Sequence, residues 1–264
     1  MYLISSWGSS GSGKTTVALA LASAFAKRNA DVLLLSAEMR TPLLPVLLPS
    51  MTALTGSNSI GPLLTGELTL TEASLKDKLI RHPKSNHVFC LGLVSGETAA
   101  MTYGPPVRDA AIHLFQILAQ TPFRYVIVDC DSNPLYDQLS LAALEYAQTG
   151  LAVLTPDIKG YEFWKAQLSW LGTSDAIHMD QYLKIANPVG KHTLLQDARA
   201  LFGGFAYELP YTPQAAEKMA AGELLTGLNT ATAGVVFEQQ ISRLADQIEE
   251  AEHAGTANDT ELIS

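Results

Sequence analysis

The chain has 264 residues, 47% of them hydrophobic and 16% charged, so it can bury the core of one large α/β domain or two small ones. A formal net charge of −9 argues against a protein whose whole surface holds nucleic acid, and no nucleic-acid partner is expected. Cys90 and Cys130 lie in apolar runs without a C-x-x-C pair, which predicts buried free thiols in a reducing compartment. No apolar run is long enough to cross a bilayer and the chain enters its first strand directly, so we expect a cytoplasmic protein without a signal peptide or integral membrane segment.

The first half of the chain alternates strand and helix patterns. The apolar run Tyr2-Leu3-Ile4 predicts a short buried strand, and residues 14–27 predict a helix. Residues 31–36 are apolar without alternation, which is typical of a strand in a parallel sheet. Thr71 is expected to cap a helix. The elements predicted next are short helices at 60–66 and 70–80, a strand at 87–91, a helix at 107–120 and a strand at 125–129.

The second half continues this alternation. The elements predicted there are a helix at 135–148, a strand at 151–155, a helix at 161–171, strands at 182–187 and 205–211, a helix after Pro213 and a last helix at 233–251. This order predicts the fold class α/β, with a mostly parallel, doubly wound sheet flanked by helices. We expect one domain over residues 1–251 and a polar, disordered tail over residues 252–264.

Residues 7–16, WGSSGSGKTT, match the pattern G-x-x-x-x-G-K-[ST] of a phosphate-binding P-loop between a predicted strand and a predicted helix. Glycines allow the backbone to curl so that several N–H groups point at one ligand, and the positive end of the next helix adds to the field. Lys14 is expected to bridge the β- and γ-phosphates of a nucleotide, and the Thr15 hydroxyl to ligate Mg²⁺. The residues predicted to surround the nucleotide here are Gly8, Ser9, Ser10, Gly11, Ser12, Gly13, Lys14, Thr15 and Thr16. The alternative is a Gly/Ser-rich turn that binds nothing.

Other polar residues follow predicted strands. Parallel sheets bind ligands at the carboxyl ends of their strands, where the P-loop, the segment after Ser36, Asp129 and Asn187 are expected to meet. Asp129 ends a buried strand, which suits an acid that holds Mg²⁺ with Thr15; its alternative role is a helix cap or turn residue. Asp131 is two residues further on and equally suits a cap for the segment that follows.

These residues resemble the ParA/MinD group of deviant Walker ATPases. The segments that carry the resemblance are Gly11–Thr16, Leu33–Glu38, Tyr125–Cys130 and Leu209-Pro210-Tyr211, with Asn187 where the group often places an adenine-contacting Asn. The resemblance spans residues 1–226 and implies a P-loop NTPase fold, the ligands ATP and Mg²⁺, an ATP-dependent homodimer, and nucleotide contacts from Asn187, Pro210 and Tyr211.

A narrower resemblance is to TadZ/CpaE-like proteins of Flp or type IV pilus and secretion clusters. It depends on Trp7-Gly8-Ser9, Thr41–Pro49 and Leu154–Asp157. It implies a protein partner in a pilus or secretion machine, which would recruit the chain to the inner face of the membrane.

Two positions depart from the ParA/MinD pattern. The group's extra lysine falls at Ser9, and its usual aspartate after the second strand falls at Ser36, with Glu38 as the nearest acid. Serine cannot supply positive charge to a partner's phosphates, so we expect slow or regulated hydrolysis in which Lys14, Glu38 and Asp129 are the catalytic residues. Arg40 either supplies the missing charge or forms a surface salt bridge.

Three functions compete for this sequence. The first is a nucleotide-gated assembly switch, and the second is a kinase or ATP-dependent ligase acting on a small molecule, for which the available cations form no lid-like cluster. The third is a degenerate scaffold that holds nucleotide without turnover. Membrane attachment through the last helix is not expected, because its polar face is acidic and packing against the domain explains its apolar face.

Overall fold

Within the described residues, eight strands form one sheet, and every neighbouring pair is parallel except β3 and β4. The computed structural model describes residues 1–264 except 52–53, 99–101, 105 and 262–264. The order across the sheet is β3-β4-β2-β5-β1-β6-β7-β8. The strands are β1 (Tyr2–Gly8), β2 (Val32–Ser36), β3 (Ile80–Arg81), β4 (Val88–Leu91), β5 (Tyr125–Asp129), β6 (Thr149–Leu154), β7 (Leu183–Val189) and β8 (Tyr207–Pro210). The predicted α/β class with a mostly parallel sheet is confirmed.

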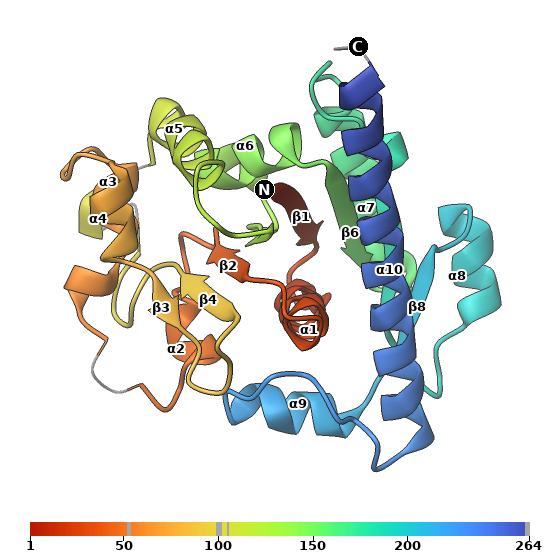
Figure 1. Ribbon diagram of the computed structural model, residues 1–264. Helices are drawn as coiled ribbons and strands as arrows, with labels where there is room; N and C mark the ends of the chain where they lie inside the picture. The colour runs from red at the N-terminus through yellow and green to blue at the C-terminus, as the bar shows by residue number, and fades with distance from the viewer. Residues whose placement is uncertain (52–53, 99–101, 105, 262–264) are drawn as a thin grey trace.

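Helices cover both faces of this sheet and make three layers (Figure 1). The helices are α1 (Lys14–Lys27), α2 (Leu44–Leu47), α3 (Gly61–Leu64), α4 (Glu72–Lys76), α5 (Arg108–Leu118), α6 (Gln138–Tyr146), α7 (Ile158–Leu171), α8 (Leu195–Phe202), α9 (Pro213–Ala220) and α10 (Thr232–Glu261). The apolar cluster on one face contains α1 and α10, and the cluster on the other contains α5, α6 and α7.

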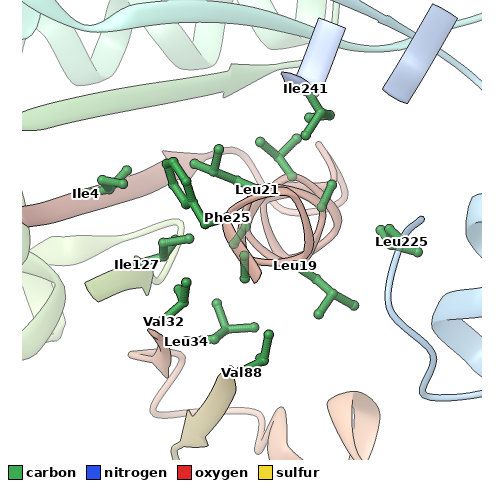
Figure 2. Close-up of a cluster of buried hydrophobic side chains, with 14 of the residues drawn as sticks. Ile4, Leu19, Leu21, Phe25, Val32, Leu34, Val88, Ile127, Leu225 and Ile241 are labelled. Atoms are coloured by element: carbon green, nitrogen blue, oxygen red, sulfur yellow. The ribbon is translucent and has the colours of Figure 1, made fainter. Parts of the chain in front are cut away.

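Side chains of the central strands alternate between these two clusters. Ile4, Leu34 and Ile127 point toward Phe25 of α1 (Figure 2), whereas the neighbouring Leu3 belongs to the opposite cluster. Successive residues of a strand face opposite sides, so a strand covered by helices on both sides must be apolar throughout. This explains the unbroken apolar runs in the sequence.

The carboxyl ends of β1, β2 and β5 lie next to one another. Asp129 at the end of β5 is in register with Ser6 of β1 on one side and with Ser36 of β2 on the other. Residues that follow these three strands are therefore brought to a single edge of the sheet, although they are far apart in the sequence.

Helix α10 packs along α1 and β8. Phe237, Ile241, Leu244 and Ile248 of α10 are buried in the core, which confirms that its apolar face packs against the domain. Arg28, the C-cap of α1, forms ion pairs with Asp246 at 2.7 Å and Glu249 at 2.6 Å. No described helix has the length and hydropathy of a membrane span.

Some predicted boundaries are wrong. Thr71 caps α4 by accepting the Ser74 N–H at 3.1 Å, as predicted, but α4 ends at Lys76, and Ile80–Arg81 pairs antiparallel with β4 instead of continuing the helix. Two residues are too few to show a strand period. Helix α8 was not predicted; it is short and buries only Ala198 and Phe202. Helix α10 continues past Ala251, where the sequence predicts its end, to Glu261.

Candidate functional site

The P-loop is a tight curl between the end of β1 at Gly8 and the start of α1 at Lys14. Gly11 and Gly13 have φ angles of +77° and +86°, which residues with a side chain rarely adopt. Within the curl, the Ser12 N–H donates to the Ser9 carbonyl at 3.1 Å. The predicted loop therefore forms, and its curvature depends on its glycines.

Neighbouring strands press closely against this curl. A Cβ atom at Gly8 would lie 1.8 Å from the carbonyl oxygen of Val153 in β6, and one at Gly13 would lie 2.2 Å from Nδ2 of Asn187. Asn187, on β7, donates from Nδ2 to the Ser12 carbonyl at 2.7 Å. Asn187 thus supports the loop directly, and its contact with an adenine ring stays a prediction.

Asp129 and Thr15, which are predicted to hold a cation, lie in direct contact. The Thr15 hydroxyl donates to Oδ2 of Asp129 at 2.6 Å, while Oδ1 of Asp129 is buried and has no hydrogen-bond partner among the described residues. Burial raises the pKa of the Asp129 carboxyl to about 6, although Thr15 and Lys14 oppose the shift. A buried carboxylate oxygen without a partner fits a cation, because an unpaired buried acceptor is otherwise costly.

Magnesium would need further ligands at this position. Among the described residues, no group of three or more His, Cys, Asp or Glu side chains could hold a metal ion. Mg²⁺ is commonly bound by one or two protein oxygens together with phosphates and waters. The pair of Thr15 and Asp129 therefore fits magnesium that arrives with a nucleotide.

Two serine hydroxyls near the P-loop are also buried without a hydrogen-bond partner among the described residues. One is Ser12 within the loop, and the other is Ser36 at the end of β2, in register with Asp129. Buried polar groups are nearly always paired with protein, water or ligand. Their grouping with Oδ1 of Asp129 is consistent with an edge of the sheet that binds a polar ligand.

Lys14 reaches across the sheet edge to the segment after β5. Its Nζ donates to the hydroxyl of Ser132 at 2.8 Å, and the side chain is largely buried. Ser132 is not among the predicted site residues, because nothing in its local pattern separates it from a turn serine. Its position directly after Asp131 is the signal that links it to the site.

Glu38, Arg40 and Asp131 form a charged cluster at the same edge. Arg40 donates to Asp131 from Nε at 3.0 Å and from Nη2 at 2.6 Å, and its Nε lies 3.8 Å from Glu38. Burial and the neighbouring Asp131 carboxylate raise the pKa of Glu38 to about 7. Asp131 also accepts the Asn133 N–H at 2.7 Å, so it has the predicted capping role as well. Arg40 forms the predicted salt bridge.

The end of β8 at Pro210 leads directly into an exposed residue, Tyr211. The Tyr211 N–H donates to the Val189 carbonyl at 2.8 Å, while 56% of the surface of Tyr211 is exposed. The nucleotide contacts of Pro210 and Tyr211 stay predictions. A cleft of 960 Å³ also opens from Gly11 toward the start of α7 and α8, and its lining includes Pro188 and Lys191.

Sequence comparison gives no relative: no family model and no curated protein matches the chain. Solved structures do match. A ParA family ATPase from Chlorobium tepidum is 15% identical with a TM-score of 0.74, over 92% of this chain and 98% of that chain. MinD from Pyrococcus horikoshii, complexed with Mg-ADP, is 15% identical with a TM-score of 0.68, over 94% and 96%. MinD in the MinC:MinD complex from Aquifex aeolicus is 17% identical with a TM-score of 0.69, over 92% and 96%.

The chain has the fold of the ParA and MinD ATPases. These likenesses cover 92–94% of the chain, so the shared fold extends well beyond the P-loop. At identities of 15–17% they establish the fold, and the function must be argued from the site.

Proposed function

We propose that this protein is an ATP-binding switch of the ParA/MinD type. The observation that carries the proposal is the pair of Thr15 and Asp129 at the mouth of the P-loop, with one buried carboxylate oxygen left for a cation. Among proteins of this fold, MinD from Pyrococcus horikoshii is complexed with Mg-ADP. ATP with Mg²⁺ is therefore the ligand that this site fits best.

Each residue of the site has a distinct task in binding. The P-loop N–H groups would surround the phosphates, and Lys14 would exchange the Ser132 hydroxyl for β- and γ-phosphate oxygens. Thr15 and Asp129 would hold Mg²⁺, which neutralises phosphate charge when it is bound. The cleft beside Gly11 provides room for the rest of the nucleotide.

Glu38 is the candidate for activating water. Its pKa of about 7 is near neutral pH, where a general base works best, and the Lys14 charge, which lowers this pKa, supports a position on the P-loop side of the sheet edge. Ser9, at the position of the extra lysine, cannot stabilise a transition state with positive charge. We therefore propose slow hydrolysis that a partner stimulates, and ATP-dependent formation of a homodimer.

The proposal also includes a protein partner that responds to the nucleotide state of the switch. The sequence resemblance to TadZ/CpaE-like proteins supports a role in positioning or assembling a Flp or type IV pilus or a secretion apparatus, at the inner face of the membrane. MinD, which has the same fold, occurs in a MinC:MinD complex in Aquifex aeolicus. A Lys14→Ala chromosomal variant that retains normal surface pili and secretion would refute this role.

Nucleotide titration followed by sedimentation tests the switch. We expect the wild type to bind Mg-ATP and to dimerise with a non-hydrolysable ATP analogue but not with ADP. Lys14→Ala should lose binding, whereas Lys27→Ala, which removes an exposed lysine at the far end of the same helix, should not. A wild type that binds no adenine nucleotide in magnesium buffer would refute the proposal.

The other functions predict different results. A degenerate scaffold would bind nucleotide but release phosphate no faster than Lys14→Ala. A kinase or ligase would bind ATP without changing its mass and would consume ATP only when its small-molecule substrate is added.

A further inference from the structure

Arg40 is held in a fixed orientation by a buried acid. Its Nε and Nη2 donate to the two carboxylate oxygens of Asp131 at 3.0 and 2.6 Å, and only 3% of the Asp131 side chain is exposed. The Asp131 main-chain N–H donates to Ser140 at 2.8 Å, and its Oδ1 also accepts the Asn133 N–H. A bidentate arginine–carboxylate pair fixes the plane of the guanidinium, so Arg40 is oriented before any ligand arrives.

The other end of this guanidinium is available. A guanidinium carries five N–H donors, and Asp131 takes one from Nε and one from Nη2. Among the described residues, none accepts a hydrogen bond from Nη1, and 63% of the Arg40 side chain is exposed. The free N–H groups of Nη1 and Nη2 form a fork, a geometry that matches two oxygens of a phosphate.

Arg40 also lies on the same edge of the sheet as Lys14, the cationic side chain of the P-loop. Asp131, which holds Arg40, is followed directly by Ser132, which accepts from Lys14 at 2.8 Å. Glu38 lies 3.8 Å from Arg40, and the charges of both Lys14 and Arg40 lower its pKa, so the three side chains belong to the same edge of the sheet. A phosphate bound by Lys14 would therefore extend toward Arg40 on the same chain.

Resting on the proposed function, we propose that Arg40 is a second phosphate-binding cation, which binds the terminal phosphate of a nucleoside triphosphate through the fork that Asp131 leaves free. Asp131 acts as its positioning residue. The terminal phosphate is the one nearest to Arg40 because the other phosphates lie within the P-loop curl. Arg40 would thus help the site to distinguish a triphosphate from a diphosphate.

A plain surface ion pair is the competing role, and the chain contains a matched example. Arg199 of α8 donates from Nε and Nη2 to Glu208, both at 2.6 Å, and 40% of its side chain is exposed. This pair has the same bidentate form and joins α8 to β8, not the P-loop edge. Arg199→Ala therefore removes a comparable pair without touching the proposed phosphate contact.

The test compares the dissociation constants of AMPPNP and ADP, each with Mg²⁺, for the wild type, Arg40→Ala, Arg40→Lys and Arg199→Ala. Loss of a charge-assisted hydrogen bond should weaken AMPPNP binding to Arg40→Ala by about tenfold or more and leave ADP within about twofold of the wild type. Arg40→Lys should be intermediate, because it keeps the charge without the fork, and Arg199→Ala should match the wild type for both ligands.

Three results would overturn the inference. Equal weakening of AMPPNP and ADP binding in Arg40→Ala would show that Arg40 has only a structural role. An unchanged AMPPNP affinity would show that Arg40 does not contact the terminal phosphate. If the wild type binds neither nucleotide, the proposed function and the inference fail together; if it binds both and only the Arg40→Ala selectivity is absent, the inference alone fails. Circular dichroism and a melting curve show whether Arg40→Ala folds, and Arg40→Lys gives an independent reading if it does not.

Discussion

Substitution of Gly13 by alanine should destabilise the protein more than the same substitution at Gly11. Both glycines have φ angles in the left-handed region, +86° and +77°, so both alanines carry a similar backbone cost of about 1–2 kcal/mol. They differ in their surroundings: a Cβ at Gly13 lies 2.2 Å from Nδ2 of Asn187, whereas a Cβ at Gly11 meets nothing within 4 Å.

The contact with Asn187 sets the size of the difference. To make room for the methyl group, Asn187 must move, and its 2.7 Å hydrogen bond to the Ser12 carbonyl is lost or weakened. Overpacking typically costs about 1–3 kcal/mol and a lost hydrogen bond about 1 kcal/mol, so Gly13→Ala should cost about 3–6 kcal/mol in total against about 1–2 kcal/mol for Gly11→Ala. The effect of alanine on the unfolded chain is the same at both positions and cancels in the comparison.

Urea unfolding without nucleotide measures this difference, with tryptophan fluorescence as the signal because Trp7 is buried beside the loop. In the double variant Gly13→Ala/Asn187→Ala the new methyl group no longer meets the Asn187 amide. The loss of unfolding free energy should therefore be smaller than the sum for the two single variants by about 1–3 kcal/mol. Equal costs for Gly11→Ala and Gly13→Ala, or strictly additive costs in the double variant, would refute this account of the loop.

Three further predictions concern the cation pair, pH and α10. Asp129→Asn should bring the ratio of nucleotide affinities with magnesium and with EDTA close to one, because the charge that holds the cation is lost; an unchanged ratio would exclude Asp129 as its ligand. Burial raises the pKa of Asp137, the N-cap of α6, from 3.8 to about 7, so the stability linked to its protonated form falls as pH rises toward 7 and is lost above it. The free energy of unfolding in urea should fall between about pH 4 and pH 7 by up to about 1.4 kcal/mol per pH unit; Asp137→Asn should flatten the fall, and a parallel slope would contradict the assignment. Arg28→Ala should lower the free energy of unfolding by about 1 kcal/mol and speed amide hydrogen exchange in α10, with a smaller effect in high salt. An unchanged exchange rate would show that the ion pair between Arg28 and Glu249 does not stabilise α10.

Local patterns were sufficient to predict the parts of the site that lie in one segment. The P-loop has a fixed spacing, and Asp129 ends an unbroken apolar run, so each can be identified without knowledge of its neighbours. The strand order across the sheet is not local, but the alternation of strands and helices restricts it, which is why the α/β class was predictable.

The partners of these residues were not predictable in the same way. Lys14 pairs with Ser132 because β1 and β5 are neighbours in the sheet, and Arg40 pairs with Asp131 because β2 and β5 are. The hydrophobic periodicity of a segment does not specify which side chain on another strand its polar residues will contact. Asn187 shows the same limit, since its resemblance to an adenine-contacting residue gave no indication that its amide holds the P-loop carbonyl.

The side chains that would bind the nucleotide and its cation are already bonded to protein atoms. Lys14 donates to Ser132, so it must exchange this partner for phosphate, whereas Thr15 donates to Asp129 and keeps its oxygen lone pairs for a cation. For Lys14 the exchange replaces a neutral hydroxyl by charged oxygens, which form stronger hydrogen bonds, and it therefore favours the ligand. For Thr15 no bond has to break, because its O–H can go on donating to Asp129 while its oxygen lone pairs ligate a cation, and that cation can also satisfy the Asp129 oxygen that is buried without a partner. Phosphate binding at Lys14 and cation binding at Thr15 and Asp129 depend on each other, because phosphate alone would face Asp129 as a like charge, and this is the physical reason to expect that magnesium and nucleotide bind together.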